Sequence, residues 1–83
     1  MTTYQQELGS QERILRVLTA LIDLPIDDWH TADIAAHAGV SRAGASNDLH
    51  VLAEHRFVRP TADGWCPAHR FLGIAAKISR LAA

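Results

Sequence analysis

The sequence predicts a mainly α-helical fold with one small β-hairpin. Apolar residues recur at helical spacing in four segments, which begin near Ser10, Thr31, Ser41 and His69. Asp63-Gly64 separates two short apolar runs, RFVRP and WCP, and an Asp-Gly pair between such runs favours a tight hairpin turn. Pro60 and Pro67 restrict that hairpin to a short ribbon.

The segment Thr31–Leu52 predicts two short helices joined by a tight turn. Candidate N-caps open three of the predicted helices: Ser10, Thr31 and Ser41. Gly39 suits the left-handed residue that ends a helix, because glycine has no Cβ to clash there. Small alanines let the two helices approach closely, as a helix-turn-helix requires.

The remaining segments complete a winged helix-turn-helix in a single domain, residues 1–83. The first helix ends at Pro25 and carries an apolar stripe of Ile14, Val17, Leu18, Leu21 and Ile22. Residues 26–30 are too few for a helix and are expected to be extended, with Trp29 turned inward. The predicted architecture is a three-helix core, a short wing and a C-terminal helix over residues 69–82, with residues 1–9 flexible.

Composition limits the class of protein. The chain has 83 residues, of which 48% are hydrophobic and 20% charged, as expected for one small globular domain. It shows neither a signal-peptide pattern at the N-terminus nor an apolar run of membrane-spanning length, so we expect a cytoplasmic protein that does not enter a membrane. The single cysteine, Cys66, excludes an internal disulfide and suits a reducing compartment.

The net charge of -1 hides an uneven distribution. Residues 1–41 contain two basic and six acidic side chains, whereas residues 42–83 contain six basic and three acidic ones. A domain with one nucleic-acid-binding face would show this asymmetry, although an ordinary dipolar soluble protein would show it too. The small positive excess argues against tight non-specific binding to DNA.

Three stretches of the chain, within about residues 12–76, resemble the N-terminal DNA-binding domain of the IclR family of bacterial regulators. They are ERILRVLTAL, TADIAAHAGVSRAGASNDLHVLAEHRFVRP and DGWCPAHRFLGIA. The resemblance implies a winged helix-turn-helix that regulates transcription. Gly44 and Asp48 depart from the small hydroxyl residue and the aliphatic that are usual in the family. IclR proteins usually carry a larger effector-binding domain beyond this point. The present sequence stops before such a domain, so the ligand sensing of the family is not carried over to it.

The predicted third helix has one side suited to the core and another suited to DNA. The core side carries Ala45, Leu49 and Leu52. The other side carries Arg42, Ala43, Ser46, Asn47 and His50. Arg42 can reach a guanine edge or a phosphate, and Asn47 has the donor and acceptor that match adenine. Ser46 can donate to a phosphate, and Ala43 can pack on a thymine methyl. The alternative is an exposed polar face that binds nothing.

These residues predict a sequence-specific regulator of transcription in a prokaryote or phage, with the third helix in the major groove of double-stranded DNA. The alternative is a winged-helix module that binds proteins, such as a phage or mobile-element accessory protein docking on a host complex. In the wing, Arg59 is either a phosphate contact or a solvated strand-edge charge. Asp63 at the wing tip would be repelled by phosphate and is expected to form the turn, so the wing should contribute little.

The sequence shows no pattern typical of a catalytic or metal-binding site. Its five histidines and Cys66 form neither a CxxC motif nor a histidine pair at i, i+4 spacing. We therefore predict a protein that is not an enzyme and that uses neither a metal nor a cofactor.

The C-terminal helix predicts a homodimer. Its apolar stripe, which is longer than one small domain is expected to cover, consists of Phe71, Ile74, Ala75, Ile78 and Leu81. Tyr4 and Leu8 could extend the same surface. A symmetric pair would double the contacts with a palindromic site. The alternative is that this helix folds back and closes the core of its own domain.

Overall fold

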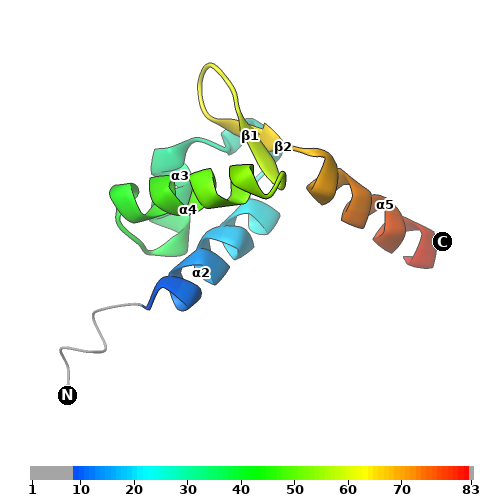
Figure 1. Ribbon diagram of the computed structural model, residues 1–83, viewed down its shortest axis with the longest axis horizontal. Helices are drawn as coiled ribbons and strands as arrows, with labels where there is room; N and C mark the ends of the chain where they lie inside the picture. Colours follow the sequence, from blue (N-terminus) through cyan, green and yellow to red (C-terminus); the bar gives the residue numbers. More distant parts are fainter. Residues whose placement is uncertain (1–8, 83) are drawn as a thin grey trace.

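The computed structural model describes residues 9–82 and confirms the winged helix-turn-helix (Figure 1). In chain order, the elements are helix α2 (Ser10–Asp23), the 3-10 helix η1 (Ile26–Asp28), helices α3 (Thr31–Ala38) and α4 (Arg42–Glu54), strands β1 (Val58–Pro60) and β2 (Trp65–Pro67), and helix α5 (His69–Ala82). The expected flexibility at the N-terminus and the roles of Tyr4 and Leu8 concern residues 1–8, which lie outside the described part of the chain.

Helices α2, α3 and α4 pack against one another around one core, and the hairpin closes its open end. The buried apolar residues are Val17, Ala20, Leu21, Trp29, Ile34, Ala35, Ala45, Leu49, Leu52, Val58 and Trp65. The expectation that Trp29 turns inward is confirmed, because it is only 3% exposed. The two strands pair antiparallel, with Arg59 opposite Cys66, and each strand ends at its proline.

Two of the three predicted N-caps are wrong. Helix α2 is capped by Gly9 and α3 by His30, and neither makes a side-chain cap hydrogen bond. Thr31 instead lies inside α3, where its hydroxyl accepts a hydrogen bond of 3.0 Å from the indole nitrogen of Trp65. Ser41 caps α4 as predicted, since its hydroxyl accepts from the Gly44 backbone N–H at 3.0 Å.

The prediction that residues 26–30 are extended is wrong, because this segment begins with one turn of 3-10 helix. The Asp28 N–H donates to the Pro25 carbonyl at 2.9 Å, and the Trp29 N–H donates to the Ile26 carbonyl at 3.2 Å. A 3-10 turn needs only three residues, so it fits where an α-helix does not. The turn delivers the Trp29 side chain to the core, where its indole N–H donates to the Leu24 carbonyl.

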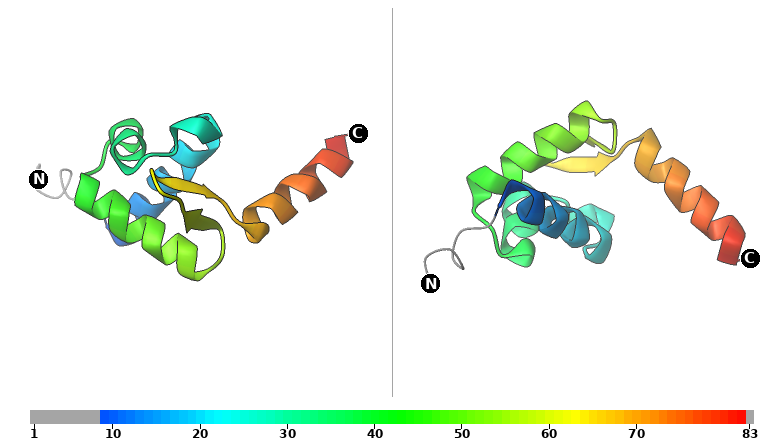
Figure 2. Two further views of the ribbon diagram at one scale, coloured as in Figure 1. Left: turned by 90° about the horizontal axis from the view of Figure 1, so that it is seen from above. Right: turned by 60° about the horizontal axis from the view of Figure 1, so that its bottom comes forward.

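Helix α5 extends away from the rest of the domain (Figure 2). Only its first turn contacts the core, through Phe71, whose ring centroid lies 5.6 Å from that of Trp29. Further along α5, Ile74 and Ile78 are 53% and 58% exposed. The helix therefore does not fold back to close the core. No helix in residues 9–82 is long and apolar enough to span a membrane.

Candidate nucleic-acid interface

The turn between α3 and α4 sets the angle at which α4 projects from the domain. Gly39 ends α3 with φ of 72°, and its N–H and that of Val40 both donate to carbonyls of the last turn of α3. This paired arrangement is a Schellman motif, which favours glycine at the left-handed position. Ser41 then starts α4 immediately, so the two helices are joined by the tight turn that the sequence predicts.

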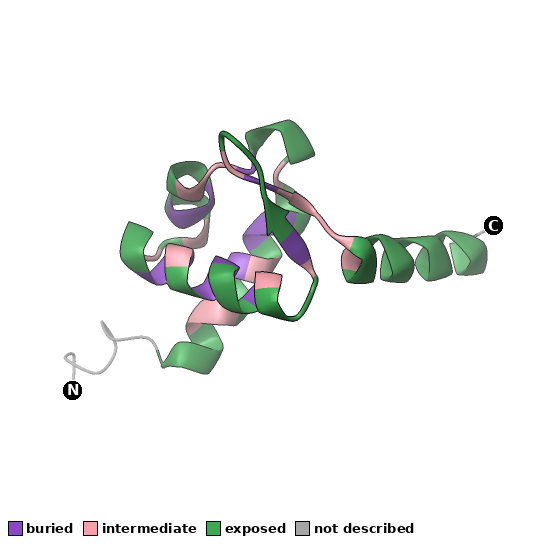
Figure 3. Ribbon diagram, turned by 45° about the horizontal axis from the view of Figure 1, so that its top comes forward, coloured by how far each residue is buried: buried purple, intermediate pink, exposed green. Residues whose placement is uncertain are grey.

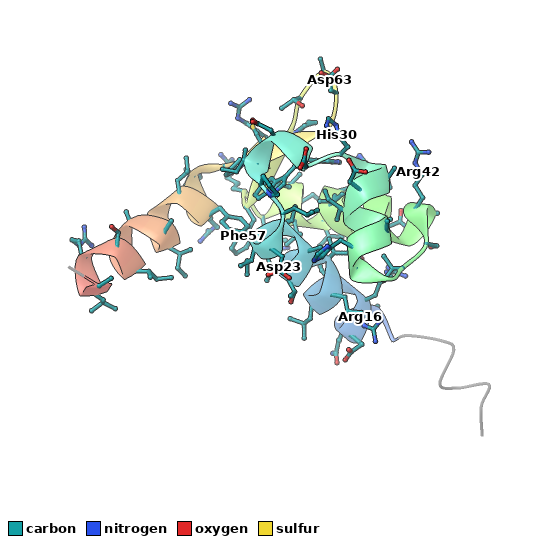
Figure 4. All side chains as sticks on the ribbon, turned by 180° about the vertical axis from the view of Figure 1, so that it is seen from behind. Arg16, Asp23, His30, Arg42, Phe57 and Asp63 are labelled. Atoms are coloured by element: carbon teal, nitrogen blue, oxygen red, sulfur yellow. The ribbon has the colours of Figure 1, made fainter. Side chains whose placement is uncertain are left out.

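The buried and the exposed residues of α4 lie on different sides of the helix, as predicted (Figure 3). Ala45, Leu49 and Leu52 are buried in the core. Arg42, Ala43, Asn47 and His50 are exposed, and Ser46 is half-buried. The structure thus brings all five predicted residues together on the outward surface of one helix. Figure 4 shows the Arg42 side chain pointing away from the domain.

An ion pair between α2 and α4, in which the carboxylate is buried and the guanidinium partly exposed, is the main feature that the sequence interpretation missed. Arg13 donates from Nε to Asp48 Oδ2 at 2.8 Å and from Nη2 to Asp48 Oδ1 at 2.9 Å. The Asp48 side chain is 6% exposed and that of Arg13 is 29% exposed. The hydrogen bonds that Arg13 donates to Asp48, together with the negative charge of that carboxylate, raise the pKa of Arg13 above its ordinary value. The signal was present, because Asp48 lies between Ala45 and Leu49 and therefore next to the core side of α4.

This pair changes the electrostatics of the outward surface. The carboxylate of Asp48 faces α2 and is neutralised there, so it does not lie among the outward polar residues. Gly44 allows the close approach, since a Cβ at this position would lie 2.9 Å from Arg13 Cδ. The two departures from the usual family pattern, Gly44 and Asp48, therefore belong to one contact with Arg13.

His50 joins α4 to the wing. Its Nδ1 lies 2.7 Å from the Ser46 carbonyl oxygen, and because a carbonyl only accepts, Nδ1 carries the proton. The imidazole also packs edge-on against Trp65, with 5.2 Å between the ring centroids. Of the five outward residues, His50 is thus held in place by contacts with both α4 and β2.

The wing is fixed to the segment that precedes α3, and Figure 4 shows His30 of that segment next to Asp63 of the wing. His30 Nδ1 donates to the Asp63 carbonyl at 3.0 Å, and the Trp65 N–H donates to the Trp29 carbonyl at 2.9 Å. The hydrogen bond to Asp63 raises the pKa of His30, and the charge of Asp33 adds to this effect while partial desolvation opposes it. The turn itself is closed by the hydroxyl of Thr61, which accepts from the Gly64 N–H, and not by the side chain of Asp63.

The cations divide into paired and free groups within residues 9–82. Arg13 pairs with Asp48, and Arg16 with Glu12 at 3.5 Å. Arg42 and Arg59, the two cations that were considered as phosphate contacts, are exposed and form no ion pair there. The structure places Arg59 on the hairpin stem opposite Cys66, on a different element from the outward residues of α4. In the same part of the chain, no three His, Cys, Asp or Glu side chains gather where they could hold a metal ion.

Comparison with protein families identifies this arrangement. The family model of the IclR helix-turn-helix domain matches residues 10–62. The chain belongs to the IclR helix-turn-helix domain family. No curated protein sequence gives a significant match. The IclR match covers α2, α3, α4 and β1 and stops within the wing, so that β2 and α5 lie outside it. The IclR helix-turn-helix is a DNA-binding domain of transcription regulators and not an enzyme family, which assigns this chain to DNA-binding transcription regulation.

Proposed function

We propose that this domain is a cytoplasmic, non-catalytic regulator that binds DNA sequence-specifically. It acts with α4 in the major groove of an operator. The observation that carries the proposal is the outward surface of α4. It is exposed, and Asp48 is withdrawn from it by Arg13. A helix presenting short polar side chains without a nearby free carboxylate can enter the groove between two walls of phosphate.

Each outward residue has a role that its chemistry supports. Asn47 reads adenine through its paired donor and acceptor, and Ala43 packs on a thymine methyl. Arg42 and Ser46 contact phosphates and position the helix, while His50 contacts the groove from its fixed place beside the wing. Arg59 adds a phosphate contact from the hairpin stem. Since Asp63 occupies the wing tip, that tip contributes little binding.

Substitutions of Asn47 and Arg42 should have different effects on DNA binding. Asn47→Ala should weaken binding to the preferred duplex by about 1–3 kcal/mol and relax preference at one base pair, because a base contact is lost. Arg42→Ala should weaken binding to preferred and scrambled duplexes alike, because a phosphate contact is lost. The salt slope, which is the slope of the logarithm of the binding constant against the logarithm of the salt concentration, should decrease in magnitude by about one unit. Fluorescence titrations across a salt series would measure both effects on a duplex selected from random sequences.

Circular dichroism provides the folding control, since both side chains are exposed and neither variant should unfold. If the wild-type domain binds no duplex, or binds all sequences equally, the proposed function is wrong. If both variants bind like the wild type, α4 is not the reader, and binding to a protein becomes the better explanation.

We also propose that the domain binds DNA as a homodimer through α5. The apolar stripe Phe71, Ile74, Ala75, Ile78 and Leu81 supports this, because beyond Phe71 it is exposed to solvent. Exposed large apolar residues on one face of a helix are typical of an interaction surface. A two-fold pair would present two copies of α4 to the halves of a palindrome.

The variant Ile78→Asp should convert the dimer to a monomer, because it buries an unpaired carboxylate in the proposed interface. Light scattering would measure the mass at working concentrations, with and without DNA. Lys77→Asp introduces the same side chain one position away, off the stripe, and should leave the mass unchanged. A wild-type protein that is monomeric under both conditions would rule out the dimer.

A further inference from the structure

A concave surface that encloses about 560 Å³ lies where the end of α4, the hairpin stem and the start of α5 meet. Three of its lining residues are basic: Arg56, Arg59 and His69. They come from the loop after α4, from β1 and from α5, so the fold gathers them from three separate segments. None of the three forms an ion pair with another residue in the described part of the chain.

Arg56 occupies a backbone conformation that favours glycine. Its φ is 66°, and it is the one residue other than glycine with positive φ among residues 9–82. The Arg56 N–H donates to the Ala53 carbonyl, and the Phe57 N–H donates to the Leu52 carbonyl, which forms a Schellman motif at the end of α4. The same position after α3 is occupied by Gly39. Because glycine would adopt this conformation with less strain, what arginine adds here is its guanidinium group.

The concave surface continues the wing-facing edge of α4. Ser46, His50 and Ala53 follow one another along that edge at helical spacing, and Ala53 lines the concave surface. His50 contacts the wing through Trp65. A duplex that follows this edge therefore passes from the outward residues of α4 to the three basic side chains.

We propose that Arg56, Arg59 and His69 form a second phosphate-binding site, which contacts the DNA backbone beside the groove occupied by α4. The inference rests on the proposed DNA-binding function and adds a site beyond α4. Guanidinium groups match phosphate oxygens in geometry and charge, and contacts of this kind increase affinity without selecting a sequence. Glu54 lines the same surface, and its carboxylate repels a phosphate bound there.

The decisive variant is Arg56→Gly, which removes the cation and relieves the left-handed backbone. It should unfold at the same urea concentration as the wild type or a higher one. At 0.1 M salt, its affinity for preferred and scrambled duplexes alike should fall about five- to tenfold, with the salt slope reduced by about one unit.

Arg59→Gln should behave in the same way, and the variant that combines Arg56→Gly with Arg59→Gln should lose about two units of salt slope. Glu54→Gln should strengthen binding to both duplexes.

Arg16→Gln is the matched control, because it removes the same charge from the surface of α2, where Arg16 pairs with Glu12. Its affinity should stay within about twofold of the wild type. If Arg56→Gly and Arg59→Gln bind like the wild type while Asn47→Ala is impaired, the second site does not exist. The phosphate contact proposed for Arg59 then fails with it, while the reading of DNA by α4 stands. If Arg16→Gln weakens binding as much as Arg56→Gly, the effect is one of total charge, and the site is again excluded. If the wild type binds no DNA, the proposed function itself fails.

Discussion

Replacing Arg13 with methionine should lower the free energy of unfolding by about 3 kcal/mol. The substitution leaves Asp48, whose side chain is 6% exposed, without its two hydrogen bonds from Arg13. Removing one partner of a buried pair usually destabilises a protein by roughly 3–5 kcal/mol, because a charge then remains uncompensated away from water. We expect the lower end of this range, since Arg13 is 29% exposed and water can enter the space that it leaves. Urea unfolding followed by circular dichroism would measure the loss.

Two further variants separate the unpaired charge from the lost packing. The double variant Arg13→Met/Asp48→Leu should recover most of the loss, because apolar residues of similar volume often replace a buried pair without penalty. Arg16→Met on the exposed side of α2 should change stability by less than about 0.5 kcal/mol, as expected for a surface pair. An Arg13→Met protein with the same urea midpoint as the wild type would show that the pair does not stabilise the domain.

The substitution Gly64→Ala should destabilise the domain by about 3 kcal/mol and detach the wing. A Cβ on Gly64 would collide with the carbonyl oxygen of Trp29 and approach His30 Cα to 3.2 Å. The Trp29 carbonyl cannot move without breaking its hydrogen bond to the Trp65 N–H. The added Cβ is fixed by the backbone of residue 64, and the atom that it meets is a backbone oxygen, so neither can rotate away. We therefore expect the upper end of the usual effect of overpacking, which is roughly 1–3 kcal/mol. Thermal unfolding would measure the loss, and tryptophan fluorescence would report the altered environments of Trp29 and Trp65.

Gly73→Ala makes the same chemical change in α5, where an added Cβ meets nothing within 4 Å. Alanine is favoured over glycine in a helix interior by about 1 kcal/mol, so this variant should be at least as stable as the wild type. If both alanine variants unfold at the same temperature as the wild type, the close approach between Gly64 and Trp29 is not a constraint on the fold.

The parts of the fold that depend on local chemistry could be predicted from the sequence. Gly39 and Ser41 define the turn before α4, and the Asp63-Gly64 turn lies between two strands that end at their prolines. The segment 69–82 was predicted to be a helix and is one, because its apolar period continues through its whole length.

The parts of the fold that depend on tertiary contacts could not be predicted from the sequence. Thr31 resembles a cap by residue type, but its hydroxyl accepts from Trp65, which lies far away in the sequence. Periodicity places Asp48 near the core without naming Arg13 as its partner. For the candidate interface, periodicity gave the outward residues of α4, because one helix carries them all. It could not give the surface shared by Arg56, Arg59 and His69, since three segments must fold before these residues meet.

The extended position of α5 leaves most of this helix without packing contacts in its own domain. Helix nucleation is unfavourable, and an isolated helix of about 12–15 residues is only marginally stable in water. Helix α5 spans 14 residues, and beyond Phe71 the rest of its domain gives it no buried contact. If α5 is covered by a second copy as proposed, the ordering of its backbone and the association should form one cooperative transition, governed by the concentration of the protein.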